Sequence, residues 1–355
     1  GGQSISLNQA NTFSSTVTFT ALSGTITEVT IRDSDALDLG ALTTTGGLTV
    51  TAGGAVTNSG TLVIPGTTTI SASGHAVTLG DSSNNFGTTA ITGANVAITD
   101  TNAIILGAST VSGTYSVTAG GDITDSGALM ITGASTFTAA SGQSVTLNNT
   151  NNFDGTVTFA AASGNLKNVT VTDTTALDLA ALTLAQVASA GGNLTITTGG
   201  ALTDSGALVI PGTTTITATG QVVDLDHTSN NFATILFGSS SNAVSSVEVV
   251  DTNAIVIGAS KSTGNFTVTA GGDVTDSGTV TVGGNLSVTT SASNGLINMG
   301  TLAVDGTIAL ATNGNGAATV VNDAGLNFAA STVRGALSAT ATTGNITQSG
   351  ALDIE

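Results

Sequence analysis

Apolar and polar residues alternate with a period of two along most of this chain. Residues 194–197 read Leu-Thr-Ile-Thr, and residues 266–269 read Phe-Thr-Val-Thr. Such alternation places apolar side chains on one face of a β-strand and the threonines on the other face. Glycine also recurs every few residues, which would destabilise the interior of any helix. The pattern therefore predicts an all-β chain of short strands, each with one buried face.

One 16-residue sequence motif recurs several times along the chain. The copies read TAGGAVTNSGTLVIPG (51–66), TAGGDITDSGALMITG (118–133), TTGGALTDSGALVIPG (197–212) and TAGGDVTDSGTVTVGG (269–284). A Ser-Gly marker returns at similar intervals, at Gly60, Gly127, Gly206, Gly278 and Gly350. Two further markers follow it: a turn aspartate (Asp33, Asp100, Asp173, Asp251 and Asp323) and a phenylalanine after an Asn-rich turn (Phe13, Phe86, Phe153 and Phe232). We infer five sequence units, approximately 1–72, 73–140, 141–218, 219–290 and a diverged 291–355.

Each unit has a finer period of about 22–25 residues, which separates the strand phrases beginning at Ile98, Ile123 and Val145. This is the length of one coil of a β-helix, whereas propeller blades need about 40–50 residues and sandwich domains about 100. The sequence predicts one continuous single-stranded parallel β-helix, or β-solenoid, over 1–355. Three coils per unit would make about fifteen coils. The inward column contains Leu48, Tyr115, Leu194 and Phe266.

Composition narrows the classes of function. Only 7% of residues are charged, and the net charge is −18 with just four bases, Arg32, Lys167, Lys261 and Arg334. So few bases cannot neutralise a row of phosphates, which argues against nucleic-acid binding and against docking on anionic lipid. No run approaches the roughly 18 apolar residues of a membrane span. The chain has no cysteine, which excludes disulfides and thiol chemistry.

Turn aspartates are the candidate metal ligands. Asp100, Asp125 and Asn148 occupy similar turns of successive coils, so we expect them to stack as a polar ladder along one corner. Such residues commonly form Asx-turns with the backbone. Stacked carboxylates also suit calcium, which prefers oxygen ligands. The calcium candidates are Asp100, Asp125, Asp204 and Asp276. We predict no other cofactor.

Residues suited to catalysis are sparse. The two histidines, His75 and His227, lie about two units apart and cannot act as a pair. Asp224 and Asp226 form the one close acid pair beside a histidine, and alternation places both on one face. Glycoside cleavage needs clustered carboxylates with tuned pKa values. We therefore expect this protein not to be an enzyme.

Two sets of outward-facing residues, the Asn-x-Ser/Thr sequences and the Thr-x-Thr pairs, each have two interpretations. Asn-x-Ser/Thr sequences are possible glycosylation sites, and their asparagines are Asn148, Asn168, Asn193, Asn265, Asn285 and Asn345. The same residues would also serve simply to begin strands. Thr-x-Thr pairs could tile a regular face, as in ice-binding solenoids, and they occur at Thr170/Thr172, Thr195/Thr197, Thr215/Thr217 and Thr267/Thr269. The pairs do not recur in every coil, which weakens the ice-binding alternative.

The phrases GNLTITTGGALTDSGAL (192–208), GNFTVTAGGDVTDSG (264–278) and ATGQVVDL (218–225) resemble the repeat regions of filamentous-haemagglutinin-like adhesins. These adhesins are large exoproteins of two-partner secretion in diderm bacteria. The resemblance covers most of the chain and is weakest over 291–355. It implies a right-handed parallel β-helix, export to the cell surface, and a role as a stalk or adhesive fibre. It carries over no catalytic residues, and the secretion domain's Asn-Pro motifs are not seen.

Together these observations predict an extracellular structural segment. Its expected partners are other copies of itself, head to tail, or flanking repeats of a longer polypeptide. Adhesion to host or matrix glycans or proteins through the solvent face is the alternative. An ice-binding or polysaccharide-degrading β-helix is a more distant one.

Overall fold

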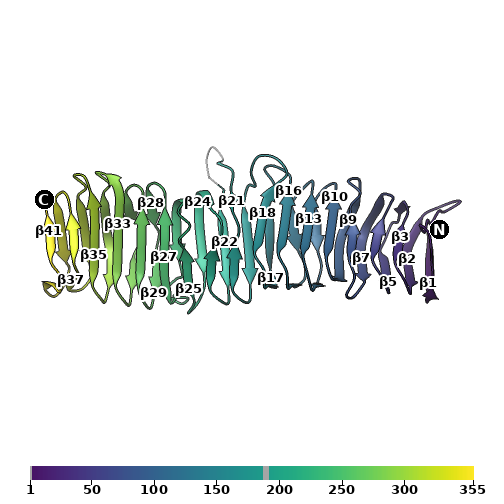
Figure 1. Ribbon diagram of the computed structural model, residues 1–355, viewed down its shortest axis with the longest axis horizontal. Helices are drawn as coiled ribbons and strands as arrows, with labels where there is room; N and C mark the ends of the chain where they lie inside the picture. Colours follow the sequence, from purple (N-terminus) through teal and green to yellow (C-terminus); the bar gives the residue numbers. More distant parts are fainter. Residues whose placement is uncertain (1, 187–191) are drawn as a thin grey trace. The chain divides into compact units, whose positions relative to one another are not determined.

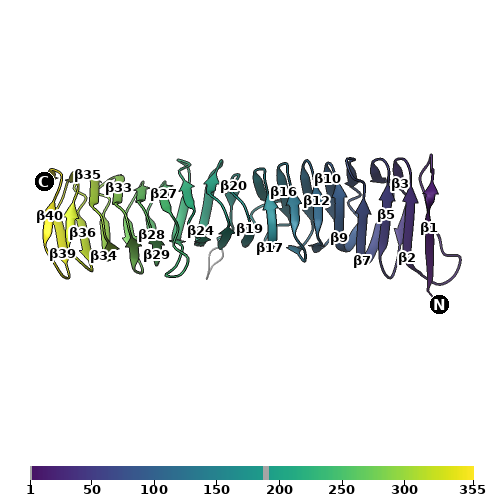
Figure 2. The ribbon, with the colours of Figure 1, turned by 90° about the horizontal axis from the view of Figure 1, so that it is seen from below.

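The computed structural model describes residues 2–186 and 192–355, and the chain divides into two compact units, Gly1–Thr174 and Thr175–Glu355. Within each unit, short strands stack side by side in two sheets (Figures 1 and 2). The paired strands of the described residues run parallel, and these residues include no helix, so none of them forms a helix that could span a membrane. Stacked parallel strands in a winding chain define a β-solenoid. The predicted architecture is therefore confirmed in each unit.

The strands of unit 1 fall into two sets. The first sheet contains β1 (Gln3–Asn11), β2 (Ile26–Asp33), β4 (Leu42–Thr43), β5 (Leu48–Ala52), β7 (Leu62–Ser71), β9 (Asn85–Gly93), β11 (Ile104–Leu106), β12 (Ser109–Val111), β14 (Ile123–Asp125), β15 (Leu129–Ile131), β17 (Val145–Phe153) and β19 (Val169–Asp173). The second sheet contains β3 (Leu37–Leu39), β6 (Val56–Asn58), β8 (Val77–Leu79), β10 (Val96–Asp100), β13 (Tyr115–Ala119), β16 (Ser135–Ala139) and β18 (Val157–Ala161).

The strands of unit 2 divide in the same way. The first sheet contains β21 (Leu182–Thr183), β22 (Leu194–Thr198), β24 (Leu208–Thr217), β26 (Asn231–Phe237), β28 (Ile255–Ile257), β29 (Ser260–Ser262), β31 (Val274–Asp276), β32 (Val280–Val282), β34 (Ile297–Val304), β36 (Ala318–Asn322) and β39 (Leu337–Ala341). The second sheet contains β20 (Leu177–Leu179), β23 (Leu202–Asp204), β25 (Val222–Leu225), β27 (Ser246–Asp251), β30 (Phe266–Ala270), β33 (Leu286–Ser293), β35 (Ile308–Asn313), β37 (Leu326–Phe328), β38 (Ser331–Val333), β40 (Ile346–Gln348) and β41 (Leu352–Ile354).

Many turns of the solenoid are shorter than the predicted 22–25 residues, although Ile123 pairs with Val145 and Val145 with Val169, which lie 22 and 24 residues apart. Val247 pairs with Phe266, Phe266 pairs with Leu286, and Leu286 pairs with Ile308. These partners lie one turn apart, so a turn takes roughly 20 residues, at the short end of the range for solenoid repeats. The described chain consequently makes about 17 turns, rather than the fifteen expected from three coils per unit.

Each repeat therefore takes about three and a half turns, and successive copies of the same phrase change sheet. In unit 2, Leu194–Thr198 lies in the first sheet, Phe266–Ala270 in the second, and Leu337–Ala341 again in the first. Unit 1 follows the same rule, with Leu48–Ala52 in the first sheet and Tyr115–Ala119 in the second. The two sheets are thus equivalent environments for one sequence, offset by half a turn.

The inward positions form the predicted core. Leu48, Tyr115, Leu194 and Phe266 all have 0% exposure. In unit 1 the ring of Phe137 contacts those of Tyr115, Phe153 and Phe159 at centroid distances of 6.0, 5.9 and 5.8 Å. In unit 2 Phe237 and Phe266 meet edge to face at 5.3 Å. Inward aromatic rings on neighbouring turns therefore pack on one another, which adds to the burial of apolar area.

Glycine corners allow the turns to approach closely. A Cβ atom added at Gly271 would lie 1.9 Å from the carbonyl oxygen of Thr252 in the preceding turn. The equivalent corners at Gly53 and Gly120 would each place it 2.1 Å from a backbone oxygen. A side chain at these positions would force neighbouring turns apart.

We predict that Gly271→Ala lowers the free energy of unfolding by about 2–4 kcal/mol, because the backbone of the preceding turn occupies the space of the new methyl group. Gly300→Ala is the matched control in the same unit, since a Cβ there meets nothing within 4 Å. Its effect should stay within about 0.5 kcal/mol. Urea denaturation measures both, and equal stabilities for the two variants would contradict this packing.

Candidate functional site

A buried Asp or Asn joins neighbouring turns at the same corner of each repeat. Its side-chain oxygen accepts a hydrogen bond from the backbone N–H of an apolar residue earlier in the chain. The pairs are Asp100 with Phe86 at 2.6 Å, Asp173 with Phe153 at 2.9 Å, Asp251 with Phe232 at 2.5 Å and Asn322 with Val304 at 2.8 Å. Asp33 makes longer contacts of 3.3 and 3.4 Å with the N–H of Phe13. These residues satisfy N–H groups that the winding backbone leaves without a carbonyl partner.

The fifth unit keeps this corner with different residues. Asp323 matches the turn aspartates of the other units in the sequence, but that assignment is wrong by one position. Asn322 is the buried residue, with 1% exposure, and it bonds to Val304 where earlier units have phenylalanine. A neutral amide therefore performs the same structural task as the aspartates.

A second buried asparagine lies in three of the repeats and links adjacent turns. Its Oδ1 accepts the backbone N–H of a leucine in the preceding turn, at 2.8–2.9 Å, in the pairs Asn84–Leu62, Asn151–Leu129 and Asn230–Leu208. The Nδ2 atoms of Asn151 and Asn230 also donate to Asp125 and Asp204 of that preceding turn, whereas Asn84 Oδ1 accepts from Asn58 Nδ2. Two Asx residues thus join each pair of adjacent turns at this corner.

The structure separates the four calcium candidates. Asp100 ends a strand of the second sheet and Asp125 a strand of the first, so the expected ladder through Asp100, Asp125 and Asn148 does not form. Asp125 does receive the backbone N–H of Asn148, at 2.9 Å. Asp276 accepts N–H groups of Gly300 and Thr301 at 2.9 and 2.7 Å. The ladder fails because the half-turn offset places successive phrases on different sheets.

Hydrogen-bond donors lie against these carboxylates, most of them N–H groups, with the Thr301 hydroxyl against Asp276. Asp100 accepts the N–H groups of Phe86 and Asn102, and Asp204 accepts the Asn230 amide at 2.6 Å. Within residues 2–186 and 192–355, no group of three or more His, Asp or Glu is placed to hold a metal ion. Asp100 makes an Asx-turn bond with the N–H of Asn102, whereas Asp125, Asp204 and Asp276 accept donors from the following turn. Calcium binding stays a sequence-based prediction.

Burial changes the acidity of several corner carboxyls. Desolvation raises the pKa of Asp100 and of Asp251, against the lowering effect of their backbone hydrogen bonds. Burial raises the pKa of Asp204 to about 6, although its hydrogen bond to Asn230 acts in the opposite direction. The Oδ1 atom of Asp204 is buried with no hydrogen-bond partner. The charged form of Asp204 is therefore poorly solvated.

The acid pair beside His227 lies on the outside of the second sheet of unit 2. Asp224 points outward from β25, and Asp226 is exposed just beyond it, as alternation predicted. Burial, with the charge of Asp226, raises the pKa of Asp224. His227 accepts the backbone N–H of Ser229 at 3.2 Å, and His75 is exposed in unit 1. Asp224 thus lies on a strand and His227 in the turn that follows it, and the charge of Asp226 acts on both Asp224 and Asp204.

Asparagines of the glycosylation sequences occupy solenoid corners. The Oδ1 atoms of Asn193, Asn265 and Asn285 accept the N–H of the stacked residue in the next turn, at 2.9–3.0 Å. Asn345 is exposed, Asn168 is half-buried, and Asn148 is exposed within β17. A corner-stacking role therefore accounts for three of them, and glycosylation stays a prediction.

Outward threonines align over short stretches. Thr195 pairs with Thr215 and Thr197 with Thr217, but Leu236 follows Thr215 in the next turn. Thr267 pairs with Ser287. Hydroxyl rows are interrupted by apolar or charged residues within a few turns, as the sequence indicated.

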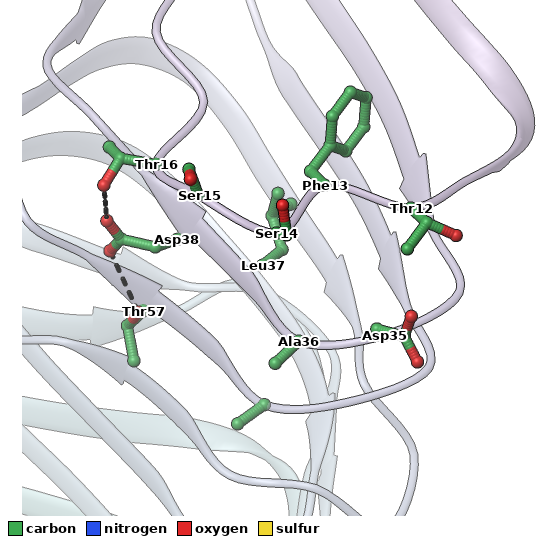
Figure 3. Close-up of a pocket in the computed structure, with 11 residues that line it drawn as sticks. Thr12, Phe13, Ser14, Ser15, Thr16, Asp35, Ala36, Leu37, Asp38 and Thr57 are labelled. Atoms are coloured by element: carbon green, nitrogen blue, oxygen red, sulfur yellow. Dashed lines mark hydrogen bonds between the residues drawn. The ribbon is translucent and has the colours of Figure 1, made fainter.

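A surface hollow in unit 1 was not predicted from the sequence. It encloses about 470 Å³ between the segment following β1 and the turn that precedes β3. Figure 3 shows Asp38 turned toward Thr16 and Thr57 at one side of it. Three hydroxyls donate to this carboxylate, from Thr16 and Ser59 at 2.6 Å and from Thr57 at 3.0 Å.

The hydroxyls around Asp38 fix its charge state. Partial burial acts to raise the pKa of Asp38, but hydrogen bonds from Ser59, Thr16 and Thr57 outweigh it and hold the pKa below the usual 3.8. Asp178 accepts the hydroxyls of Thr203 and Ser205 in the same way in unit 2. The cluster is thus a repeated structural feature. In the sequence, this cluster corresponds to an Asp on one strand followed by a Thr and a Ser, two residues apart, at the adjacent strand.

Comparison with protein families identifies the class of protein. The family described as repeats of unknown function (DUF5649) matches residues 27–92, 93–160, 166–237, 244–298 and 315–355. These matches cover most of the chain, so the protein belongs to this family of β-solenoid repeats. Comparisons with curated proteins and with solved structures found no match.

We predict that Asp251→Ala lowers the free energy of unfolding by roughly 2–4 kcal/mol, because the N–H groups of Phe232 and Asn253 lose their acceptor in a buried corner. Asp251→Asn keeps one acceptor oxygen and should lose less than half as much. Asn322 is the natural precedent for this substitution. Chemical denaturation of the two variants measures the difference, and equal losses would argue against the corner hydrogen bond.

The raised pKa of Asp204 predicts how the stability of the fold depends on pH. Its folded pKa of about 6 lies above the usual 3.8, so the folded chain binds this proton more tightly than the unfolded chain does. The contribution of Asp204 to stability therefore rises as the pH falls through about 6 towards 4. Asp204→Asn should raise the free energy of unfolding at pH 8 by about 1–2 kcal/mol and change it little near pH 4.

Asn58 occupies the equivalent place in the first repeat, where its amide donates to the Gly60 carbonyl at 2.9 Å. The control is Asp154→Asn, an Asp-to-Asn change at an exposed position, which should alter the free energy of unfolding by no more than about 0.5 kcal/mol. Urea titrations at the two pH values make the measurement. A loss of stability at pH 8 in Asp204→Asn would refute the assignment.

Proposed function

We propose that this chain is a structural segment of a secreted bacterial surface protein, a solenoid that extends by adding further turns. The added turns come from flanking repeats of the same polypeptide or from the end of another copy, head to tail. The observation that carries the proposal is the stacking of repeats within each unit, where parallel strands of successive turns extend the same two sheets. The proposed role requires no catalysis.

The last turn leaves core positions uncovered. Ile346 is 51% exposed, whereas its counterparts Leu202 and Val274 have 0% exposure. Ile354 is 42% exposed, and its counterpart Ile210 has 0% exposure. These side chains point along rows that another turn covers everywhere else in unit 2. An added turn would bury them and would also pair the free backbone groups of the last strands.

The first turn shows the same feature. Phe13 and Phe19 are half-buried, whereas the equivalent Phe86 and Phe159 are 1% and 3% exposed. Two hollows flank this segment, and Phe13 lines one while Phe19 lines the other. An apolar end surface at the first turn and another at the last turn make a heterologous contact, which propagates into a filament.

The sequence of the repeats supports the extracellular location that we propose. The chain resembles filamentous-haemagglutinin-like exoproteins, and its low charge with an acidic balance suits an extracellular surface. The corner carboxylates described above each accept at least one N–H or hydroxyl donor, which favours a mechanical role over a chemical one. Glycan adhesion, ice binding and polysaccharide cleavage stay predictions from the sequence.

Self-association tests the proposal. We predict that the purified chain forms head-to-tail oligomers whose mass rises with concentration, because end burial removes apolar area from water. The double variant Ile346→Asp/Ile354→Asp should remain monomeric with an unchanged circular dichroism spectrum, since both sites are exposed. Sedimentation velocity, with electron microscopy of the larger species, measures both.

The matched control changes apolar residues on a sheet face instead. Ile105 and Met130 are 41% and 43% exposed, close to the end residues in exposure. Ile105→Asp/Met130→Asp should therefore leave association intact. A wild-type chain that stays monomeric at high concentration, or one dispersed by the face variant rather than the end variant, would contradict head-to-tail assembly.

A further inference from the structure

The sequence contains three Asn-Gly dipeptides, at 294–295, 313–314 and 315–316. They meet at a single corner of unit 2, in the segments that follow β33 and β35. The backbone N–H of Asn294 donates to the Asn313 carbonyl at 2.9 Å, and the N–H of Asn315 donates to Asn294 Oδ1 at 2.7 Å. The three pairs therefore lie on neighbouring turns, within one hydrogen-bonded group.

The three glycines differ in what their backbone nitrogens contact. Gly295 is buried, and its N–H donates to the Ala292 carbonyl at 3.1 Å. Gly316 is buried, and its N–H donates to the Asn313 carbonyl at the same distance. Gly314 is exposed, and its nitrogen instead lies 2.8 Å from the Oδ1 atom of Asn313.

We propose that Asn313 is a site of spontaneous covalent modification, by deamidation through attack of the Gly314 nitrogen on its side chain. The Gly314 nitrogen loses its proton to solvent and forms a bond to Cγ of Asn313. The Cγ–Nδ2 bond breaks, and Nδ2 takes up a proton and leaves as ammonia. Water then opens the cyclic imide at either carbonyl, which yields aspartate or isoaspartate. The sum is one water consumed and one ammonia released, with no oxidant or enzyme.

Geometry selects Asn313 over its two neighbours. A nitrogen already in contact with the amide needs little rearrangement to reach the adjacent carbon, and such positioning accelerates intramolecular reactions. The nitrogens of Gly295 and Gly316 must first break a hydrogen bond inside a buried turn. The side chain of Asn294 is further restrained, since its Oδ1 accepts the N–H of Asn315 at 2.7 Å.

The modification would weaken the corner between two turns. Asn313 Nδ2 donates to the Ser291 carbonyl at 2.9 Å, and a carboxylate cannot make that bond. Each event adds one negative charge, and isoaspartate also lengthens the backbone by one methylene group. Asn313 therefore acts as an ageing site that loosens one corner of the solenoid.

The test is incubation of the folded chain at 37 °C and mildly alkaline pH, with peptide mapping by mass spectrometry over several weeks. Isoaspartate is counted with an isoaspartyl methyltransferase. We expect Asn313 to react about tenfold faster than Asn294 or Asn315. The same chain in guanidinium chloride is the control, and there the three sites should react at similar rates because the fold no longer distinguishes them.

Two results would overturn the proposal. One is reaction of Asn294 or Asn315 in the folded chain at a rate equal to or above that of Asn313. The other is protection of Asn313 in the folded chain relative to the denatured one. Asn313→Gln, which retains an amide but disfavours the five-membered ring, should abolish the ammonia release assigned to this site without unfolding the chain.

Discussion

In-register stacking of parallel turns is the constraint on which this structure depends. Each strand obtains its backbone partners from the turn before and the turn after it, so every turn must repeat the same path. Inward positions must then be apolar in each turn, and corners must satisfy the N–H groups that bends leave unpaired. The buried Asx residues meet that second need, as Asp100 and Asp251 do for the N–H groups of Phe86 and Phe232.

Equivalence of the two sheets follows from the length of the turn. Each repeat makes about three and a half turns, so Leu194, Phe266 and Leu337 begin the same phrase on alternating sheets. A feature of one repeat thus recurs on the same sheet only after two repeats. Within unit 2, seven strand spacings of about 4.8 Å separate such features, or about 34 Å. Sites that look adjacent in a repeat alignment lie on different sheets.

Period-two alternation was sufficient to predict the strands and their inward residues, because burial at Leu48 and Tyr115 follows from the pattern alone. The half-turn offset could not be predicted, since it depends on how much chain each turn takes up, which corner geometry decides. For the same reason, the prediction that Asp100 and Asp125 stack in one ladder was wrong. Asn322 was missed because its neighbour Asp323 matched the residue type of the marker, whereas only burial shows which of the two closes the corner.

The location of strand Phe266–Ala270 tests the account most directly. A crystal or cryo-electron microscopy structure would show which strands stack in each sheet of residues 192–355. The account predicts Leu194–Thr198 and Leu337–Ala341 in one sheet, and Phe266–Ala270 in the other. A structure in which all three lie in a single sheet, three turns apart, would contradict it.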